Sequence, residues 1–247
     1  MAKEFKKTSM HTGKLNSYCP GCSHGIIERL VMECVEELGI RDRTIAIPGV
    51  GCSGLSLAYY NCDAHNPSHG RALAVATGTK RAMPDRIVFT YQGDGDLAAI
   101  GMCETVHAIA RGEKITTIFA NNMIYGMTGG QMSPTTLVGQ RGTTAVHGRD
   151  PMVNGYPIHV SEMMAQLRGA YYIERVAVNN TKNIIRAKQA IKKGFINQME
   201  GKGFNLIEVL ASCPTNWGVG PCEAMDWVEE KSMKFYPLGV FKDLDAE

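Results

Sequence analysis

Apolar residues recur along this chain at two spacings, which predict an alternation of helices and strands. Helical spacing indicates helices over residues 25–39, 72–83, 97–111, 159–169 and 181–200. Short apolar runs indicate buried strands over residues 44–47, 86–91, 115–120, 171–178 and 204–211. Because helices separate the strands, we expect a single α/β domain over residues 1–247, built on a doubly wound, mainly parallel sheet with helices on both faces.

Three stretches show no clear period. Residues 125–157 are rich in Gly, Thr and Pro, and a loop of that length inside a compact domain is usually functional or disordered. We also expect an irregular N-terminal segment over about residues 1–24 and an irregular C-terminal tail over about residues 213–247. No repeat or low-complexity linker divides the chain.

Composition narrows the class of protein. The 247 residues are 44% hydrophobic and 20% charged, which is typical of a globular chain with a sizeable core. A formal net charge of +2 gives no support for a nucleic-acid or membrane-surface partner. No apolar run is long enough to span a bilayer, and no apolar segment follows the basic N-terminus. We therefore expect a cytoplasmic protein.

Chemistry-bearing residues follow several of the predicted strands. They are the segment around Cys52, the Gly93–Asp96 sequence GDGD, the pair Asn121–Asn122, and Cys213. Open α/β sheets bind ligands in the crevice beyond the carboxyl ends of their strands. The sequence therefore predicts a binding site at that edge.

Asp94 and Asn122 form the first candidate pair. Asp94 lies between Gly93 and Gly95, which let the backbone turn sharply and approach a ligand. Gly95 and Asn122 are separated by 26 residues, enough for one helix and one strand, so both side chains can reach one point. A carboxylate and an amide oxygen suit Mg²⁺ shared with phosphate. The alternative is a helix N-cap at Asp94 and a turn at Asn122.

The cysteines form the second candidate set. Cys19 and Cys22 make a C-x-x-C motif, and Cys52 and Cys213 follow strands. Four thiolates can bind a [4Fe–4S] cluster or a structural zinc ion, and the scattered arrangement favours the cluster. Cys34 lies on the apolar face of its helix and is expected in the core. Cys62, Cys103 and Cys222 have no partner at a useful spacing.

Other features have weaker functional interpretations. Residues 49–54 match G-x-G-x-x-G, but residues 71–84 contain no acidic residue to bind a ribose, which argues against NAD. His24 and His69 are candidates for a functional role only because of the motifs beside them. A basic helix is expected to be a solvated face, with docking of an acidic electron carrier as the alternative. Its cations are Lys182, Arg186, Lys188, Lys192 and Lys193.

Taken together, these motifs resemble the β subunit of 2-oxoacid:ferredoxin oxidoreductases over nearly the whole chain. The matching segments, in order, are YCPGCSHG at 18–25, GVGCSG at 49–54, HGRALAVATG at 69–78, GDGD at 93–96, NNMIYGMTGGQMSPTT at 121–136 and CPTNWG at 213–218. GDG, about 26 residues and then NN is also the diphosphate-binding signature of thiamine diphosphate (TPP) enzymes. The ending YPLGVFKD at 236–243 looks like the branch that includes 2-oxoglutarate and branched-chain 2-oxoacid enzymes.

The resemblance implies a TPP-binding fold and specific ligands. Mg²⁺ would be bound by Asp94, the Asn122 side chain and the Ile124 carbonyl. One [4Fe–4S] cluster would be bound by Cys19, Cys22, Cys52 and Cys213. The diphosphate would lie against Gly93, Gly95, Asp96, Gly126 and Met127. The cofactor rings would lie near Val50, Gly51, Cys52, Ser53 and His69.

The resemblance also implies a reaction and partners. It implies CoA-dependent oxidative decarboxylation of a 2-oxoacid, with 2-oxoglutarate favoured over branched-chain acids or pyruvate, and electrons passing to ferredoxin. The glutamate that activates TPP is expected on a second domain, carried by a partner α subunit; γ or δ subunits are compatible with this. Alternatives are a non-oxidative TPP enzyme half with structural zinc, or an electron-transfer or zinc-stabilised binding module.

Overall fold

A parallel sheet is the centre of the computed structural model, which describes residues 7–246. Within these residues the sheet has seven strands in the order β2-β1-β3-β4-β6-β5-β7. The strands are β1 (Thr44–Pro48), β2 (Asp63–Ala64), β3 (Ile87–Gly93), β4 (Thr116–Asn121), β5 (Ala170–Ala177), β6 (Phe204–Leu210) and β7 (Gly239–Asp243). All neighbours pair in parallel except β5 and β7. The predicted mainly parallel sheet is confirmed.

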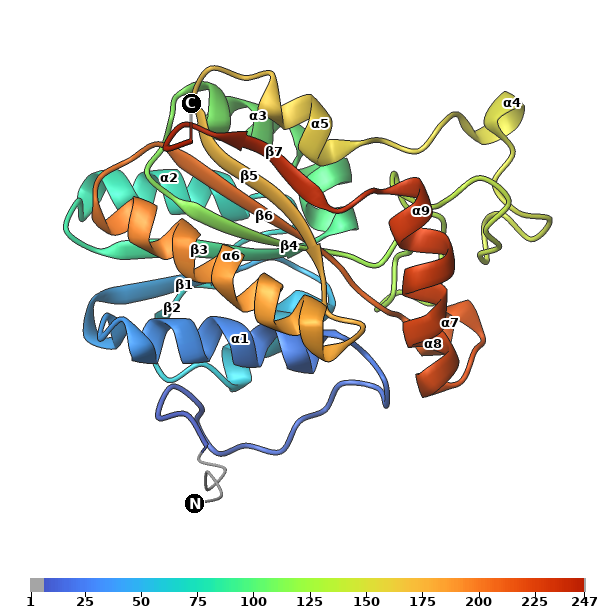
Figure 1. Cartoon of the computed structure of the whole chain (residues 1–247), viewed down its shortest axis with the longest axis horizontal. Helices are drawn as coiled ribbons and strands as arrows, with labels where there is room; N and C mark the ends of the chain where they lie inside the picture. Colours follow the sequence, from blue (N-terminus) through green and yellow to red (C-terminus); the bar gives the residue numbers. More distant parts are fainter. Residues whose placement is uncertain (1–6, 247) are drawn as a thin grey trace.

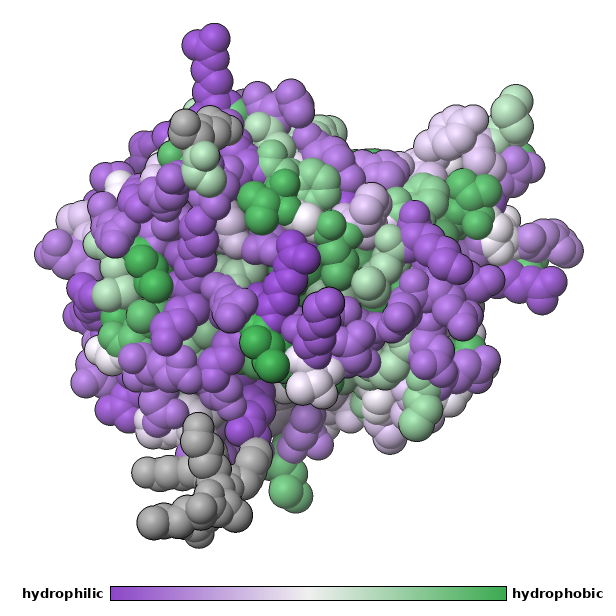
Figure 2. Space-filling model, viewed as in Figure 1, coloured by the Kyte–Doolittle hydropathy of each residue, from purple (hydrophilic) through white to green (hydrophobic). Residues whose placement is uncertain are grey.

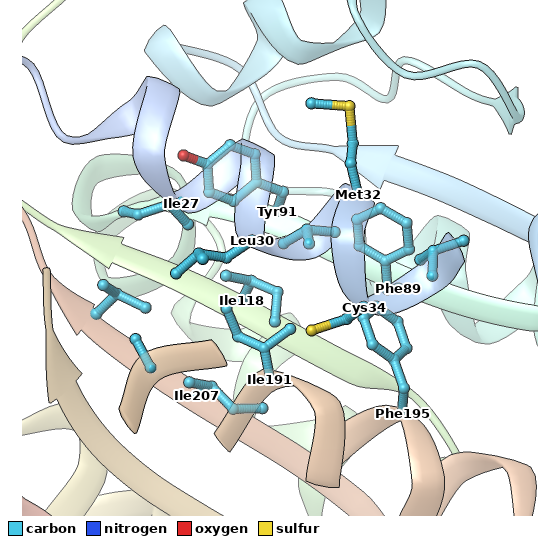
Figure 3. Packing of buried hydrophobic residues seen from close by; sticks show 14 of the residues in the cluster. Ile27, Leu30, Met32, Cys34, Phe89, Tyr91, Ile118, Ile191, Phe195 and Ile207 are labelled. Carbon is cyan, nitrogen blue, oxygen red and sulfur yellow. The ribbon is translucent and has the colours of Figure 1, made fainter. Parts of the chain in front are cut away.

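Helices cover both faces of this sheet (Figure 1). One face carries α1 (His24–Glu37) and α6 (Thr181–Met199), and the other carries α2 (Ala72–Ala82), α3 (Met102–Ala110) and α5 (Val160–Ala165). Figure 3 shows residues of α1 and α6 meeting over the strands. Cys34 is fully buried in this cluster, which confirms its expected place in the core.

Two predicted helices have different limits in the structure. The helix expected over residues 97–111 is a π-helical segment, η3 (Gly95–Ile100), followed by α3. π-Helical turns occur frequently at functional sites, and this one follows the GDGD sequence directly. The helix expected over residues 159–169 ends at Ala165. A short 3-10 helix, η1 (Arg41–Arg43), precedes β1, and another, η2 (Cys52–Ala58), follows it.

The expectation of an irregular C-terminal tail is wrong. Residues 213–246 contain α7 (Pro214–Trp217), α8 (Pro221–Trp227), the π-helical segment η4 (Val228–Ser232), α9 (Met233–Phe235) and β7. These elements are too short for a helical period to appear in the sequence. The tail is fixed by tertiary contacts instead: Tyr236 is fully buried and donates a hydrogen bond to the Thr135 carbonyl at 2.8 Å.

The long segment over residues 125–157 extends away from the sheet and carries α4 (Pro151–Asn154) (Figure 1). Arg149 fixes its base, because the buried guanidinium donates hydrogen bonds to carbonyl groups on both sides of the segment. The accepting residues include Ser133, Thr136 and Gly155. The loop is therefore tied to the residues that follow β4.

Residues 1–6 of the expected N-terminal segment, and Glu247 of the tail, lie outside the described residues. The view in Figure 2 shows a mainly hydrophilic surface with small apolar patches. Among residues 7–246, no helix combines the length and the apolar character needed to cross a bilayer.

Candidate active site

Four neighbouring parallel strands bring the candidate residues to one edge of the sheet. In the order β1, β3, β4 and β6, their carboxyl ends lead to Cys52, Asp94, Asn122 and Cys213. Each strand is buried along its length, so the apolar runs fix the strands and leave their ends to carry chemistry. The predicted common edge is present in the fold.

A cavity of about 260 Å³ lies at this edge. Every residue that the family resemblance assigned to the TPP cofactor or to Mg²⁺ lines this cavity. These residues are Val50, Gly51, Cys52, Ser53, His69, Gly93, Asp94, Gly95, Asp96, Asn122, Ile124, Gly126 and Met127. His24, Ile100, Tyr125 and Thr128 complete the lining.

Asp94 is a buried carboxylate surrounded by hydroxyl groups. The residue is 3% exposed, and Oδ2 accepts a hydrogen bond from the Ser133 hydroxyl at 2.6 Å. The Thr135 hydroxyl lies 3.0 Å from the same oxygen, and the Gly95 amide donates to Oδ1 at 2.9 Å. Burial raises the pKa of Asp94 to about 6, and these hydrogen bonds oppose that rise. A cation at this carboxylate would favour its ionised form further.

The chain after β4 turns sharply beside Asp94. Met123 has a φ of 57°, a left-handed conformation uncommon for residues other than glycine. Its carbonyl accepts hydrogen bonds from Thr136 and Gln140, which hold the turn. Asn122 and Ile124 flank Met123 and both line the cavity. Within this turn the Ile124 amide donates to Oδ1 of Asn122 at 3.3 Å and also interacts with the Asp94 carboxylate, so the three residues meet at the cavity.

Asp96 ties two loops to the end of β3. Its Oδ1 accepts hydrogen bonds from the Val50 amide at 3.0 Å and the Gly70 amide at 2.8 Å, and lies 2.8 Å from Nδ1 of His69. Its Oδ2 accepts a hydrogen bond from Gln92 at 2.7 Å.

The loop after β1 passes so close to this carboxylate that a Cβ on Gly49 would lie 2.3 Å from Oδ2. Asp96 lines the cavity, but its oxygens are occupied by the chain itself.

The C-x-x-C segment is joined to the end of β6 by a serine pair. The Ser212 amide donates to the Ser23 hydroxyl at 2.9 Å, and the two hydroxyls lie 2.8 Å apart. The Ser212 hydroxyl also donates to the Gly21 carbonyl at 2.7 Å. These bonds place Cys22 near Cys213, although the two cysteines are far apart in sequence.

The four candidate cysteines share one neighbourhood. Burial, together with repulsion from the other three, raises the pKa of Cys22 to about 12. Burial likewise raises the pKa of Cys52 to about 11, and Cys213 and Cys19 contribute to that rise. Among residues 7–246, no three His, Cys, Asp or Glu side chains form a group that could hold a single metal ion.

Gly126 connects the cysteines to the turn after β4. A Cβ at this position would lie 3.5 Å from the Sγ atoms of both Cys52 and Cys213, and 3.6 Å from Nδ2 of Asn122. Asn216 donates to the Gly126 carbonyl at 2.9 Å and to Sγ of Cys213 at 3.3 Å. The candidate cysteines and the candidate Mg²⁺ ligands are therefore adjacent.

The basic face of α6 is largely neutralised by carboxylates of this chain. Arg186 pairs with Glu174, Lys192 with Glu37, and Lys193 with Asp243; Lys188 pairs with both Glu33 and Glu37. These ion pairs join α6 to α1 and to β7. The face therefore offers an acidic carrier little unbalanced charge.

Several residues of the site were not predicted. Ser133 and Thr135 surround Asp94, Gln92 holds Asp96, and Asn216 bridges Gly126 and Cys213. The hydroxyl-rich sequence at 133–136 is the one signal that could have pointed to Asp94. His24 has a second contact besides the cavity: its Nδ1 is hydrogen-bonded to the Tyr91 hydroxyl.

The site has the features of a TPP-binding domain, and a family model described as thiamine pyrophosphate enzyme, C-terminal TPP binding domain, matches residues 49–209. The ketoisovalerate oxidoreductase subunit VorA of Methanothermobacter thermautotrophicus is 46% identical over 93% of this chain and 48% of its own length. The 2-oxoglutarate synthase subunit KorB of Methanocaldococcus jannaschii is 39% identical over 93% of this chain and 82% of its own.

Among solved structures, a 2-oxoglutarate:ferredoxin oxidoreductase from Magnetococcus marinus superposes with a TM-score of 0.78 at 26% identity. The match covers 98% of this chain and 86% of that one; that enzyme has 2-oxoglutarate, coenzyme A and succinyl-CoA bound. The chain belongs to the TPP enzymes and, within them, to the subunits of 2-oxoacid:ferredoxin oxidoreductases. It spans about half the length of the VorA relatives.

Proposed function

We propose that this chain is the TPP- and cluster-binding subunit of an enzyme that oxidatively decarboxylates a 2-oxoacid, forms an acyl-CoA and passes electrons to ferredoxin. The observation that carries the proposal is the position of Gly126. It lies against two of the four candidate cysteines and against Asn122 of the candidate Mg²⁺ site. A cofactor that releases electrons and a group that accepts them would therefore be neighbours.

The residues present fit Mg²⁺ and a diphosphate. Asp94 would supply a buried carboxylate, Asn122 an amide oxygen and Ile124 a carbonyl, and phosphate and water would complete the coordination of the ion. When bound, TPP supplies the carbanion chemistry of decarboxylation, and an iron–sulfur cluster accepts electrons one at a time. This chain's residues position the cofactor, and Asp96 holds the loops that carry Val50 and His69.

The four cysteines are suited to binding a [4Fe–4S] cluster. Each cysteine of a [4Fe–4S] cluster binds a different iron, so the sulfurs must share a neighbourhood rather than one point. Cys19, Cys22, Cys52 and Cys213 interact electrostatically with one another. Bound iron would hold these buried thiols as thiolates.

The cavity also supports a partner subunit. At about 260 Å³ it is slightly smaller than the roughly 300–1,000 Å³ of ordinary ligand sites. Asp94 and Asp96 line it, but no glutamate within residues 7–246 does. We propose that an α subunit with a pyrimidine-binding domain closes the cavity and supplies the activating glutamate. CoA and ferredoxin would bind to the assembled enzyme as co-substrate and electron acceptor. Further γ and δ subunits are compatible with this assembly.

The relatives narrow the substrate to a 2-oxoacid. Those named for ketoisovalerate share 44–46% identity with this chain, and those named for 2-oxoglutarate share 32–39%. Assays of the co-expressed subunits with both acids would distinguish them. Ferredoxin reduction with 2-oxoglutarate but not ketoisovalerate would support 2-oxoglutarate, the substrate that the resemblance favours. Ferredoxin reduction with ketoisovalerate but not 2-oxoglutarate would make ketoisovalerate the substrate.

The test is electron paramagnetic resonance of the anaerobically purified, dithionite-reduced complex, with iron counted per chain. We expect a [4Fe–4S]⁺ signal and about four irons. Cys213→Ser should diminish the signal and ferredoxin reduction while TPP stays bound. Cys103→Ser is the matched control, because Cys103 is exposed on α3. Zinc without such a signal would leave only a non-oxidative TPP enzyme half.

A further inference from the structure

A network of buried polar side chains leads from Asp94 into the sheet. The Thr135 hydroxyl lies 3.0 Å from Oδ2 of Asp94 and 2.8 Å from Oδ1 of Asn121. Nδ2 of Asn121 donates a hydrogen bond to Oε1 of Glu208 at 2.7 Å. Nε of Arg175 donates to the other oxygen of Glu208 at 2.9 Å. The four residues behind Asp94 are fully buried, and none of the four lines the cavity of the candidate active site.

The sheet fixes the far end of this network. Asn121, Glu208 and Arg175 lie on β4, β6 and β5, which are neighbouring strands (Figure 1). Arg175 is held further by Glu162 of α5, whose Oε1 accepts a hydrogen bond from Nη1 at 2.9 Å. A buried ion pair adds little net stability, because the loss of hydration offsets the attraction between its charges. The geometry that the Arg175–Glu208 pair imposes on Asn121 explains its presence better than stability does.

The ion pair determines which way the Asn121 amide faces. Glu208 is paired with Arg175, and a carboxylate in such a pair only accepts hydrogen bonds. Asn121 must therefore present its NH₂ group to Glu208 and its oxygen to Thr135. The Met123 amide donates to the same oxygen at 3.3 Å. The bond to a charged acceptor also polarises the Asn121 amide, which makes its oxygen a stronger acceptor.

The Thr135 hydroxyl therefore lies between two acceptors but has a single hydrogen. When the hydrogen points to Asp94, the positive end of the hydroxyl dipole faces the candidate Mg²⁺ site. When it points to Asn121, the hydroxyl oxygen faces the site instead. Asp94 keeps its hydrogen bonds from Ser133 and the Gly95 amide in either case. A cation at Asp94 favours the second arrangement, because it attracts the oxygen end of the dipole and repels the hydrogen.

We propose that Asn121 is a positioning residue for cation binding. It accepts the Thr135 hydrogen when a cation binds at Asp94, so that the hydroxyl oxygen faces the cation. The inference rests on the proposed function, in which Asp94 is a ligand of the Mg²⁺ that holds the TPP diphosphate. No proton passes between residues, because the hydroxyl only rotates. The two asparagines of the pair thereby have distinct roles: Asn122 lines the cavity, and Asn121 acts from behind it.

The test is calorimetric titration of the co-expressed complex with Mg²⁺, after metal and TPP are removed and a fixed concentration of TPP is supplied. Thr135→Val removes the hydroxyl, and Asn121→Ala removes the acceptor to which it turns. We expect each variant to bind Mg²⁺ about three- to tenfold more weakly, the value of one hydrogen bond. Thr135→Ser retains a hydroxyl and should keep the wild-type affinity. Thr117→Val is the matched control, because Thr117 is a fully buried threonine of β4 that is bonded to Thr90.

The double variant distinguishes positioning from packing. If Asn121 acts through Thr135, combining Thr135→Val with Asn121→Ala should weaken Mg²⁺ binding no more than either change alone, whereas independent packing defects would add. Additive losses therefore overturn the inference. A hydroxyl that only donates to Asp94 would oppose the cation, so unchanged or tighter Mg²⁺ binding in Thr135→Val also overturns it.

The remaining outcomes are equally distinct. If Asn121→Ala does not assemble, Thr135→Val and Thr135→Ser still decide the matter, because both leave the bond between Asn121 and Glu208 in place. A wild-type complex that binds TPP equally well without Mg²⁺ overturns the proposed cofactor site, and the inference with it. A wild type that needs Mg²⁺, together with a Thr135→Val variant of the same affinity, overturns the inference alone.

Discussion

Two regions of this molecule bury a carboxyl group, and they treat it in opposite ways. At the carboxyl edge of the sheet, Asp96 accepts hydrogen bonds from the Val50 and Gly70 amides and from Gln92. On α1, Glu28 is also deeply buried but has an oxygen that accepts no hydrogen bond from the described residues. Burial alone therefore does not determine what a carboxyl group does. Donors stabilise a charged carboxylate, and their absence favours the neutral, proton-carrying form.

The largest effect should follow from removing the best-satisfied carboxylate. Asp96→Ala would leave the Val50 and Gly70 amides of two loops and the Gln92 side chain of β3 without their acceptor, each costing about 1–3 kcal/mol. We expect the free energy of unfolding of the full chain to fall by about 4 kcal/mol or more, as measured by urea denaturation. Asp85→Ala, at an exposed position, should change it by less than about 0.5 kcal/mol. Equal effects of the two variants would refute the role of Asp96 in tying the loops.

Asp94 should behave differently, because its expected role is to bind a cation rather than to hold loops. Asp94→Asn keeps the shape and the acceptor oxygen but removes the charge. We expect TPP binding in the presence of Mg²⁺ to weaken by at least about tenfold, or 1.4 kcal/mol, with the fold preserved. Calorimetric titration of the complex with TPP would measure this, and Asp63→Asn on β2 is the control. Unchanged affinity in Asp94→Asn would exclude it as a Mg²⁺ ligand.

The contrast between these two aspartates marks what the sequence could and could not predict. Buried strands and the residues at their ends have local signatures, so the sheet and its binding edge were predictable, whereas the rest of the cavity lining followed from the family resemblance. The partners of Asp94 were not, because Ser133 and Thr135 reach it from a segment without any period. The C-terminal elements were missed for a related reason: the position of Tyr236 depends on a contact with Thr135, distant in sequence.

The pH dependence of Mg²⁺ binding sharpens the comparison. Burial raises the pKa of Asp94 to about 6 in the absence of a metal. The cation requires the ionised form, so protons compete with Mg²⁺ below that pH. We expect the affinity for Mg²⁺ to be constant above about pH 6 and to fall by up to about tenfold per pH unit below it. Titrations of the complex at several pH values would measure this, and an affinity that stays constant down to pH 5 would contradict it.

Glu28 should give the smallest effect and the opposite sign. Its pKa is raised from 4.5 to about 8 in the folded chain, so between these values the unfolded chain is ionised while the folded chain keeps its proton. The wild type should therefore lose stability as pH rises through this interval, and Glu28→Gln, which has no proton to lose, should not. We expect Glu28→Gln to match the wild type near pH 4.5 and to be more stable by about 1.4 kcal/mol one unit higher, at pH 5.5, as measured by urea unfolding at both values. If the wild type were the more stable protein at pH 5.5, the Glu28 carboxylate would have to accept hydrogen bonds as Asp96 does, and the contrast between the two regions would be wrong.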